Sequence, residues 1–289
     1  MAAAPATIPG ALEWLFCHYR WPNETLYHYT SFPAAQSILE KRQMWASDLR
    51  SMNDPHELRY GKRLMEDRFR KASKQARNRA RKLWLESVYS QLVTLVANRS
   101  SSYSISLSAH PNLAHQWCDY AARGTGVALG WSIDSDYPGR PLKTWVIYDR
   151  RRQEEIVDGM IVRHLTYIDQ QPSLDTATTS GLSLLRFLDV FLQTFKSQKW
   201  APEDEFRFVY QFFDDYIPDN QEFKTRTVDG VEKKYIEADF STVALRHVVI
   251  GPVANVTSTT EKLRSLFMLG SYGEVPISAS SLDPNVCRG

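Results

Sequence analysis

The stretch from residue 58 to 98 constrains the fold most, because it contains no proline and a single glycine, Gly61. Its apolar residues recur at spacings of three to five: Leu64, Phe69, Ala72, Ala76, Ala80, Leu83, Val88, Leu92 and Val96. This periodicity predicts a long helix or a helix pair with one apolar face.

The same stretch concentrates positive charge. Residues 62–82 hold ten Lys/Arg and two Asp/Glu, a charge of +8 in a chain whose formal net charge is +2. Such a run is most often a solvated helix face, but it also favours an acidic partner, whether RNA, DNA or an acidic protein. Few aromatic residues are interleaved with the charges, so sequence-specific recognition of bases is not indicated.

The rest of the chain mixes strand and helix patterns without a regular βαβ rhythm, which predicts an α+β protein. We expect an N-terminal extension with a short helix over residues 1–23. A single α+β domain should follow over residues 24–289, with residues 58–98 as a helical insertion. No apolar run approaches the ~18 residues that a membrane helix needs, and the N-terminus lacks a signal-peptide pattern. We therefore expect a cytoplasmic protein with no membrane partner.

The three cysteines, Cys17, Cys118 and Cys287, are odd in number and far apart in the sequence. This spacing argues against both a disulfide framework and a zinc knuckle. The sequence predicts free, mostly buried thiols.

The strongest chemical signal lies in "QKWAPEDEFRFVY". If a strand begins near Glu203, then Glu203, Glu205 and Arg207 share one face, opposite a row of aromatic residues. Two carboxylates beside a guanidinium can hold a sugar hydroxyl and stabilise an oxocarbenium-like transition state. The alternative is a structural ion pair on a solvated sheet face, and the spacing favours neither interpretation.

A second signal is "LYHYTS", a short strand pattern that ends at a helix start. A lone histidine such as His28 is more often structural than a ligand. Its neighbours Tyr29, Thr30 and Ser31 favour a site, because hydroxyls and free N–H groups at a helix start suit anions such as phosphates.

Three further candidates complete the set. The strand pattern "SYSISLS" alternates, so Tyr103 falls on one face while Ser106 and Ser108 fall on the other, where small hydroxyls can line a cleft. In "HQWCDY", Tyr120 is suited to stacking on a planar ring or to core packing. Asn53 lies in the loop "MNDPHE", which serves either a ligand or an Asx-turn.

Several enzyme classes lose support from missing motifs. The sequence contains no P-loop, no GxGxxG, no GxSxG and no kinase motifs, nor the ligand spacing of an EF-hand or zincin. We expect no metal.

The segments "LYHYTS", "ILEKRQMWAS", "MNDPHE", "ISLSAHPNLAHQWCDYAARGTGVALGW", "FKSQKWAPEDEFRF" and "VVIGP" resemble, in this order and over nearly the whole chain, the bacterial family of domain of unknown function 2971. More distantly, the order of a strand with His-Tyr-Thr, a Ser-x-Ser strand and a Glu-x-Glu at a strand start is similar to the motifs of ADP-ribosyltransferases. That resemblance implies mixed or antiparallel sheets in a split β-sandwich, and NAD as substrate.

Residue roles also follow from this second resemblance. It implies that His28 contacts the NAD ribose with support from Tyr29 and Thr30, that Ser106 and Ser108 form the middle motif, and that Glu205 is the catalytic carboxylate. Glu203 would orient the acceptor, and Tyr103 or Tyr120 would stack on nicotinamide. The helical insertion and the motif Ser-Leu-Ser depart from the family pattern.

The sequence therefore leads to the hypothesis of an ADP-ribosyltransferase-like enzyme that cleaves the nicotinamide glycosidic bond of NAD and transfers ADP-ribose to a macromolecule or to water. Bacterial enzymes of this kind are often toxins or phage-defence effectors, which implies an antitoxin or defence-system partner. The alternatives are a non-enzymatic nucleotide- or RNA-binding module, and a metal-dependent nuclease that uses Asp54, Glu57 and the Glu203/Glu205 pair.

Overall fold

The structure is a computed structural model, and it describes most of the chain after the first 23 residues. The described residues are 24–51, 57–98, 100–133, 141–170, 174–213, 217–218, 221–228 and 230–287. The predicted N-terminal extension, Cys17, Asn53 and Asp54 lie outside them.

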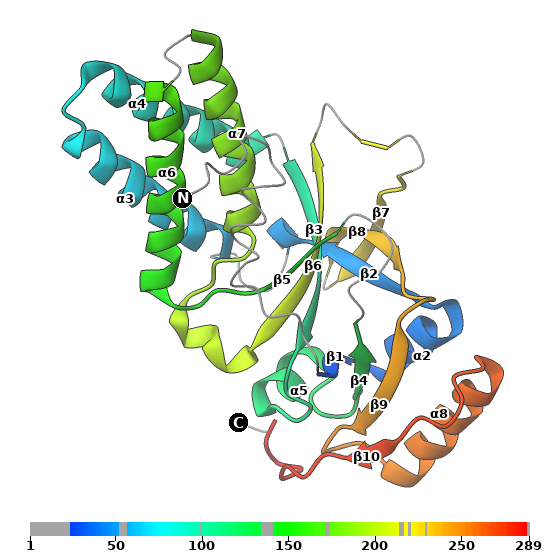
Figure 1. Cartoon of the computed structure of the whole chain (residues 1–289). Coiled ribbons are helices and arrows are strands. Elements are labelled where there is room, and N and C mark those ends of the chain that lie inside the picture. The colour runs from blue at the N-terminus through cyan, green and yellow to red at the C-terminus, as the bar shows by residue number, and fades with distance from the viewer. Residues whose placement is uncertain are drawn as a thin grey trace.

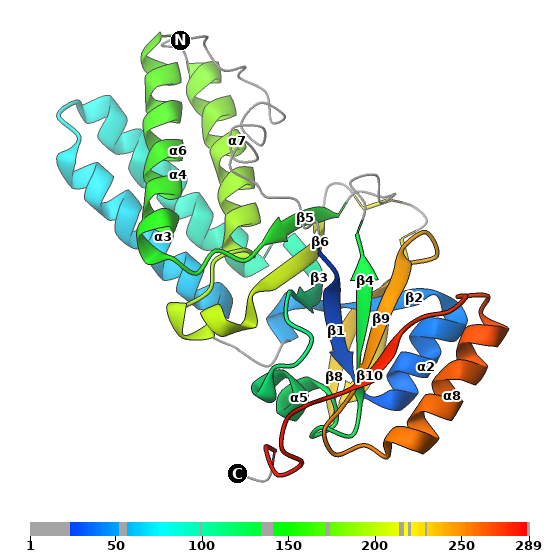
Figure 2. The ribbon, with the colours of Figure 1, turned by 60° about the horizontal axis from the view of Figure 1, so that its bottom comes forward.

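Within the described residues, four long helices form a bundle beside the sheet (Figures 1 and 2). They are α3 (Glu57–Gln75), α4 (Arg79–Asn98), α6 (Arg150–Gln170) and α7 (Leu174–Leu192). The predicted helix pair is thus α3 and α4, and it is half of the helical unit. The other half, α6 and α7, enters between β5 and β6, so the bundle is assembled from two separate insertions.

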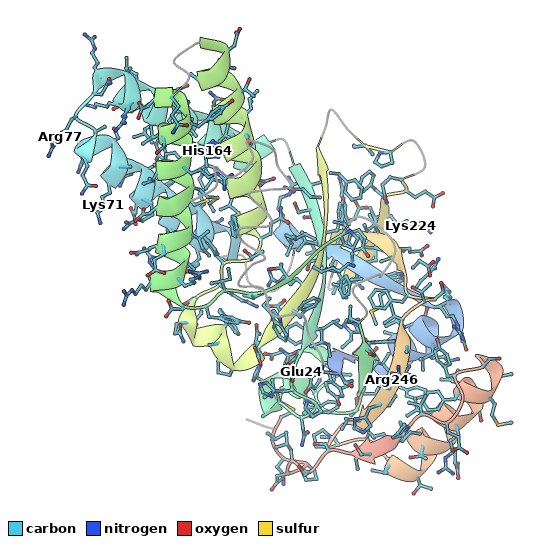
Figure 3. The ribbon with its side chains drawn as sticks, viewed as in Figure 1. Glu24, Lys71, Arg77, His164, Lys224 and Arg246 are labelled. Carbon is cyan, nitrogen blue, oxygen red and sulfur yellow. A yellow bond between two sulfur atoms is a disulfide. The ribbon has the colours of Figure 1, made fainter. Side chains whose placement is uncertain are left out.

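The bundle has a core of its own, since each helix contributes buried residues to one cluster. Leu64 and Phe69 come from α3, Val88 from α4, Val157 from α6 and Leu188 from α7. One cation of α3, Arg68, is largely buried and pairs with Glu154 and Asp158 of α6, so it joins the two helices of the bundle. Lys71 on α3, and Arg77 in the turn that follows it, lie at the end of the bundle that is remote from the sheet (Figure 3).

The remaining elements build a mixed sheet, which confirms the α+β class. Its ten described strands run in the order β10-β9-β4-β1-β3-β2-β8-β7, with β6 paired to both β3 and β5. Their bounds are β1 Leu26–Thr30, β2 Gln43–Asp48, β3 Ser100–Ser108, β4 Val127–Ser132, β5 Leu142–Trp145, β6 Glu205–Phe213, β7 Lys224–Val228, β8 Val231–Asp239, β9 Ala244–Ile250 and β10 Ile277–Ala279. All described strand pairs are antiparallel except β10 with β9.

The sheet divides into two halves where β1 and β2 both meet β3. β1 touches β3 at one pair of residues, Tyr27 opposite Ser108, and β2 joins β3 further along, with Ser47 opposite Ser104. The half made of β1, β4, β9 and β10 therefore separates from the half made of β2, β3, β5, β6, β7 and β8, and a cleft opens between them.

Three helices cover the β1 half. α2 (Phe32–Lys41) and α8 (Val256–Leu269) lie side by side and bury Leu39 and Leu263 against the main core of the sheet (Figure 2). α5 (Ala114–Tyr120) packs Trp117 on the other side of β1, against Tyr29. Within the described residues, no helix is both long and apolar enough to span a membrane.

Candidate active site

The cleft at the split encloses about 900 Å³. The cleft is lined by residues from β1, α2, β2, β3, α5, the segment before β6, the first residue of β6, β7 and β8. Eight of the predicted site residues are on this wall: His28, Tyr29, Thr30, Ser106, Ser108, Tyr120, Glu203 and Glu205. Segments separated widely in the sequence thus meet at one concave surface.

His28 occupies the point where the two halves separate. Its Nδ1 lies 3.2 Å from the carbonyl oxygen of Ser106, which is on β3 between the residues that pair with β1 and β2. Burial lowers the pKa of His28, so the ring is neutral at pH 7. Because the carbonyl can only accept, Nδ1 carries the proton, and Nε2 has no hydrogen-bond partner among the described residues. His28 thus links β1 to β3 through Nδ1 and leaves Nε2 available as an acceptor for a ligand.

The neighbours of His28 on β1 serve mainly to position the wall. The Tyr29 hydroxyl donates to the carbonyl oxygen of His110 at 2.8 Å and accepts from the Leu113 N–H at 3.0 Å, so it is fully engaged. Burial raises the pKa of Tyr29 far above its usual value. Ser31 uses its hydroxyl to cap α2 by accepting from the Ala34 N–H at 3.4 Å.

The serines of β3 divide into structural and available hydroxyls. Ser108 Oγ donates to the Glu203 carbonyl oxygen at 2.7 Å and accepts from the His110 N–H at 3.1 Å, which fixes the turn before β6. Ser104 Oγ is buried on the cleft wall with no partner in the described structure. Ser106 lies between them, directly opposite Arg207 of β6.

Glu205, Arg207, Lys196 and Glu203 form a buried charge network at one end of the cleft. Arg207 donates from Nε to Glu205 Oε1 at 2.7 Å and from Nη2 to Oε2 at 2.9 Å. Lys196 Nζ bridges the two carboxylates, at 2.6 Å from Glu203 Oε2 and 3.0 Å from Glu205 Oε2. All four residues are nearly inaccessible to water, and two cations balance two anions, as burial of charge requires.

The two carboxyl groups have opposite electrostatic environments. Burial alone would raise the pKa of Glu205, but Arg207 and Lys196 outweigh burial and hold it at about 2. Burial raises the pKa of Glu203 and repulsion from Glu205 adds to this effect, whereas Lys196, which contacts Oε2, lowers the pKa without outweighing burial. Glu205 is therefore ionised at neutral pH, while Glu203 accepts a proton more readily. This difference is the one that separates a charge-stabilising carboxylate from a general acid or base.

Three predictions about this network need correction. The strand begins at Glu205, and Glu203 lies in the preceding 3-10 helix η2 (Gln198–Glu203), so the two do not share a strand face. A left-handed residue, Asp204, turns the chain between them. Arg207 is 1% exposed and is not part of the cleft wall, so it holds Glu205 rather than a ligand, and their ion pair is buried rather than solvated.

Tyr103 also falls outside the cleft. It alternates with the serines on β3, and its ring contacts Phe212 and Phe223 in the core. Tyr120 is the aromatic residue of the pair that faces the cleft; it is 38% exposed, and burial of its hydroxyl raises the pKa to about 12.

The expectation of free thiols is wrong for two of the cysteines. Cys118 on α5 forms a disulfide with Cys287, 169 residues further along the chain. The C-terminal segment after β10 returns across α5, so the bond links this segment to the helix that carries Tyr120.

Several residues that line the cleft were not predicted from the sequence. Lys196 and Trp200 lie in the quoted segment that precedes β6, but no periodicity marked them. Trp45, Arg226 and Lys233 come from β2, β7 and β8. The buried polar atoms on the wall that lack a partner in the described structure include Ser104 Oγ, Trp200 Nε1 and Arg226 Nε. Since nearly all buried polar groups are hydrogen-bonded, this concentration indicates a surface that a ligand completes.

The fold and the cleft define an α+β protein whose split sheet holds a buried carboxylate pair at a ligand-sized cavity. A model of the family described as "Protein of unknown function (DUF2971)" matches residues 116–208. This match confirms the predicted family resemblance, over part of the chain rather than nearly all of it, and it includes both Glu203 and Glu205. No curated protein matches the chain, and no solved structure does.

Among the described residues there is no group of three or more His, Cys, Asp or Glu side chains placed to hold a metal ion. The candidate metal ligands Glu203 and Glu205 are instead bound by Lys196 and Arg207.

Proposed function

We propose that the protein is an ADP-ribosyltransferase-like enzyme that cleaves the nicotinamide glycosidic bond of NAD and transfers ADP-ribose to a macromolecule or to water. The observation that carries this proposal is that His28, Glu203 and Glu205 line one cleft at the split of the sheet. Their order along the chain is the order of the ADP-ribosyltransferase motifs to which the sequence is similar.

The charges of the network suit a reaction in which positive charge develops on a ribose. Glu205 stays ionised because Arg207 and Lys196 lower its pKa, so its field stabilises an oxocarbenium-like state without a proton transfer. Its oxygens already accept three hydrogen bonds from the two cations. Glu203, which Lys196 contacts through Oε2 and Arg207 does not hold, is the better acceptor for a ribose or acceptor hydroxyl.

His28 and Tyr120 take supporting roles in this scheme. The neutral ring of His28 offers Nε2 as an acceptor for a second ribose hydroxyl. Tyr120 presents a partly exposed ring to the cleft on the α5 side, where it can stack on a flat leaving group such as nicotinamide.

Release of nicotinamide from labelled NAD tests the proposal. Glu203→Gln is the most informative variant, because Lys196 keeps Glu205 as a partner and the fold should persist. We expect it to lose turnover, whereas Glu40→Gln, on the exposed side of α2, should retain it. Wild-type protein that releases no nicotinamide under any acceptor condition, or a fully active Glu203→Gln, would overturn the assignment.

A non-enzymatic nucleotide-binding module is the second candidate, and the complete pairing of Glu205 by two cations favours it. A binding module gains thermal stability from NAD without releasing nicotinamide, so one melting experiment beside the release assay separates the two. A metal-dependent nuclease predicts chelator-sensitive cleavage of nucleic acid; the Lys196 and Arg207 contacts to its supposed carboxylate ligands argue against it.

We further propose that the enzyme acts as a toxin or defence effector in bacteria, with an antitoxin or defence-system partner. Expression should then arrest growth, and Glu203→Gln or Glu205→Gln should relieve the arrest. The exposed cations of α3 and α4 remain the proposed surface for an acidic protein or nucleic acid.

A further inference from the structure

The end of the cleft opposite the carboxylates is cationic. Arg226 on β7 and Lys233 on β8 stand directly opposite one another across the hairpin, and both line the cleft. Like charges in this arrangement destabilise a sheet. Among the described residues neither has an acidic partner, whereas nearby Lys224 is paired with Glu237 at 2.7 Å. Two cations held together in this way indicate a site for an anion.

An exposed aromatic ring accompanies the two cations. Trp45 on β2 is 39% exposed and stacks at 4.4 Å on Tyr235, with the Arg226 guanidinium 5.2 Å from its ring centre. Arg226 Nη2 donates to Ser47 Oγ at 3.1 Å, which fixes the side chain, while its buried Nε has no partner in the described structure. The ledge formed by Trp45, Arg226 and Lys233 therefore offers a planar ring and an unfilled donor side by side.

We propose that this ledge binds a nucleotide of a single-stranded nucleic acid, with its phosphate at Arg226 and Lys233 and its base against Trp45. A groove that combines cations with aromatic rings is the arrangement that holds single strands, since an unpaired base has a free face for stacking. An acidic peptide would satisfy the charges but would leave the exposed ring of Trp45 without a matching group.

The position of the ledge determines how a bound nucleic-acid strand would lie relative to the carboxylates. β7 is separated from β6, which carries Glu205, by four strand steps of ~4.8 Å, or about 20 Å across the sheet. The serines Ser47 and Ser104 line the path between them. A bound strand can therefore extend from the ledge to the carboxylate end; provided that the proposed function holds, this strand is the acceptor of ADP-ribose.

Fluorescence anisotropy with labelled single-stranded DNA and RNA of about 12 nucleotides, in the absence of NAD, tests the ledge. We expect Trp45→Ala and the double variant Arg226→Ala/Lys233→Ala each to weaken binding by about tenfold or more. In the double variant the slope of log affinity against log salt should decrease by about 0.7, because one phosphate is no longer neutralised and each neutralised phosphate contributes about 0.7 on a single strand. Lys234→Ala, which removes the adjacent cation on the opposite face of β8, should leave binding unchanged. Melting curves establish that each variant is folded.

Binding that is equal in all variants would overturn the proposal, as would loss of the same size in Lys234→Ala. Displacement of the oligonucleotide by a poly-glutamate peptide at equal charge would assign the ledge to an acidic protein instead, and displacement by NAD alone would assign it to the donor. A protein that binds nucleic acid through the ledge but releases no nicotinamide would refute the proposed function and leave the ledge intact.

Discussion

Replacement of Glu205 by Gln should destabilise the fold, and the structure sets the size of the effect. The substitution removes one charge from a network of two carboxylates and two cations and leaves a buried excess of one positive charge. The pKa of Glu205 falls from 4.5 to about 2 on folding, which corresponds to roughly 3 kcal/mol of stability at pH 7. For a chain of this size the melting temperature should fall by about 6–12 °C.

The pH dependence has a definite sign. A carboxyl group whose pKa is lowered by folding contributes its full stability above the unfolded value, here 4.5, and loses it as the pH falls toward 2. The stability gap between wild type and Glu205→Gln should therefore be constant from pH 7 to about 5 and close at lower pH. Burial shifts the pKa of Glu203 the other way, so Glu203→Gln should cost far less at pH 7.

Urea unfolding of the wild type and both variants at several pH values measures these gaps. Equal stability of wild type and Glu205→Gln at pH 7 would refute the buried network, because an unpaired buried charge cannot be without cost. A larger loss in Glu203→Gln than in Glu205→Gln would contradict the assignment of the two environments. The comparison also shows why Glu205→Gln alone is a poor activity probe: its lost turnover would include lost folding.

Three other substitutions test separate parts of the structure. Cys118→Ser should lower the free energy of unfolding by about 3–5 kcal/mol, since it opens a disulfide between residues 169 apart, and should make stability insensitive to reductant; unchanged stability in both conditions would show that the bond does not form. Leu188→Ala, at a fully buried site in the bundle core, should cost about 2–5 kcal/mol by urea unfolding, whereas Leu182→Ala on the same helix, 53% exposed, should cost little; similar losses would disprove the bundle packing. Gly126→Ala should reduce both stability and NAD binding, measured by calorimetry. The added Cβ would stand 2.2 Å from the carbonyl oxygen of Thr30 and would displace the end of β1. Normal NAD binding by this variant would contradict this close approach.

Elements with an unbroken pattern of polar and apolar residues were predicted correctly from the sequence. The alternation of "SYSISLS" defines β3 and correctly assigns the core-facing Tyr103 and the cleft-facing Ser106 to opposite faces of the strand. The helix start that the sequence predicted at the end of "LYHYTS" is also correct, since α2 begins directly after Ser31. Local rules suffice in such segments because each residue's role depends on near neighbours in the chain.

The β7–β8 hairpin and α6 were missed although the sequence carries signals for both. The Asp-Gly pair at residues 229–230 separates two alternating segments, a hairpin pattern that the many charged residues obscure. The buried residues of α6 form a stripe of helical spacing: Ile156, Val157, Met160 and Ile161. Because the hairpin was not predicted, Arg226 and Lys233 were not identified as candidate site residues.

Other features had no local signal. Lys196 bridges two carboxylates only because η2 turns the chain back toward β6, and Cys118 meets Cys287 only because β10 returns the C-terminal segment to α5. Such contacts depend on the completed tertiary fold. Sequence patterns alone cannot indicate that Arg207 is buried beneath the cleft wall rather than exposed on it.

The placement of the helical bundle also bears on the entropic cost of folding. Pairing of β3 with β6, which brings Ser108 opposite Glu205, closes a loop on the order of 100 residues and carries the entropic cost of that length. The bundle shortens this loop, because α4 leads directly into β3, α7 precedes β6, and the two helices are in contact. A bundle that lies outside the cleft thus lowers the entropic cost of assembling the carboxylate end of the cleft, because its helices hold together the segments that lead into β3 and β6.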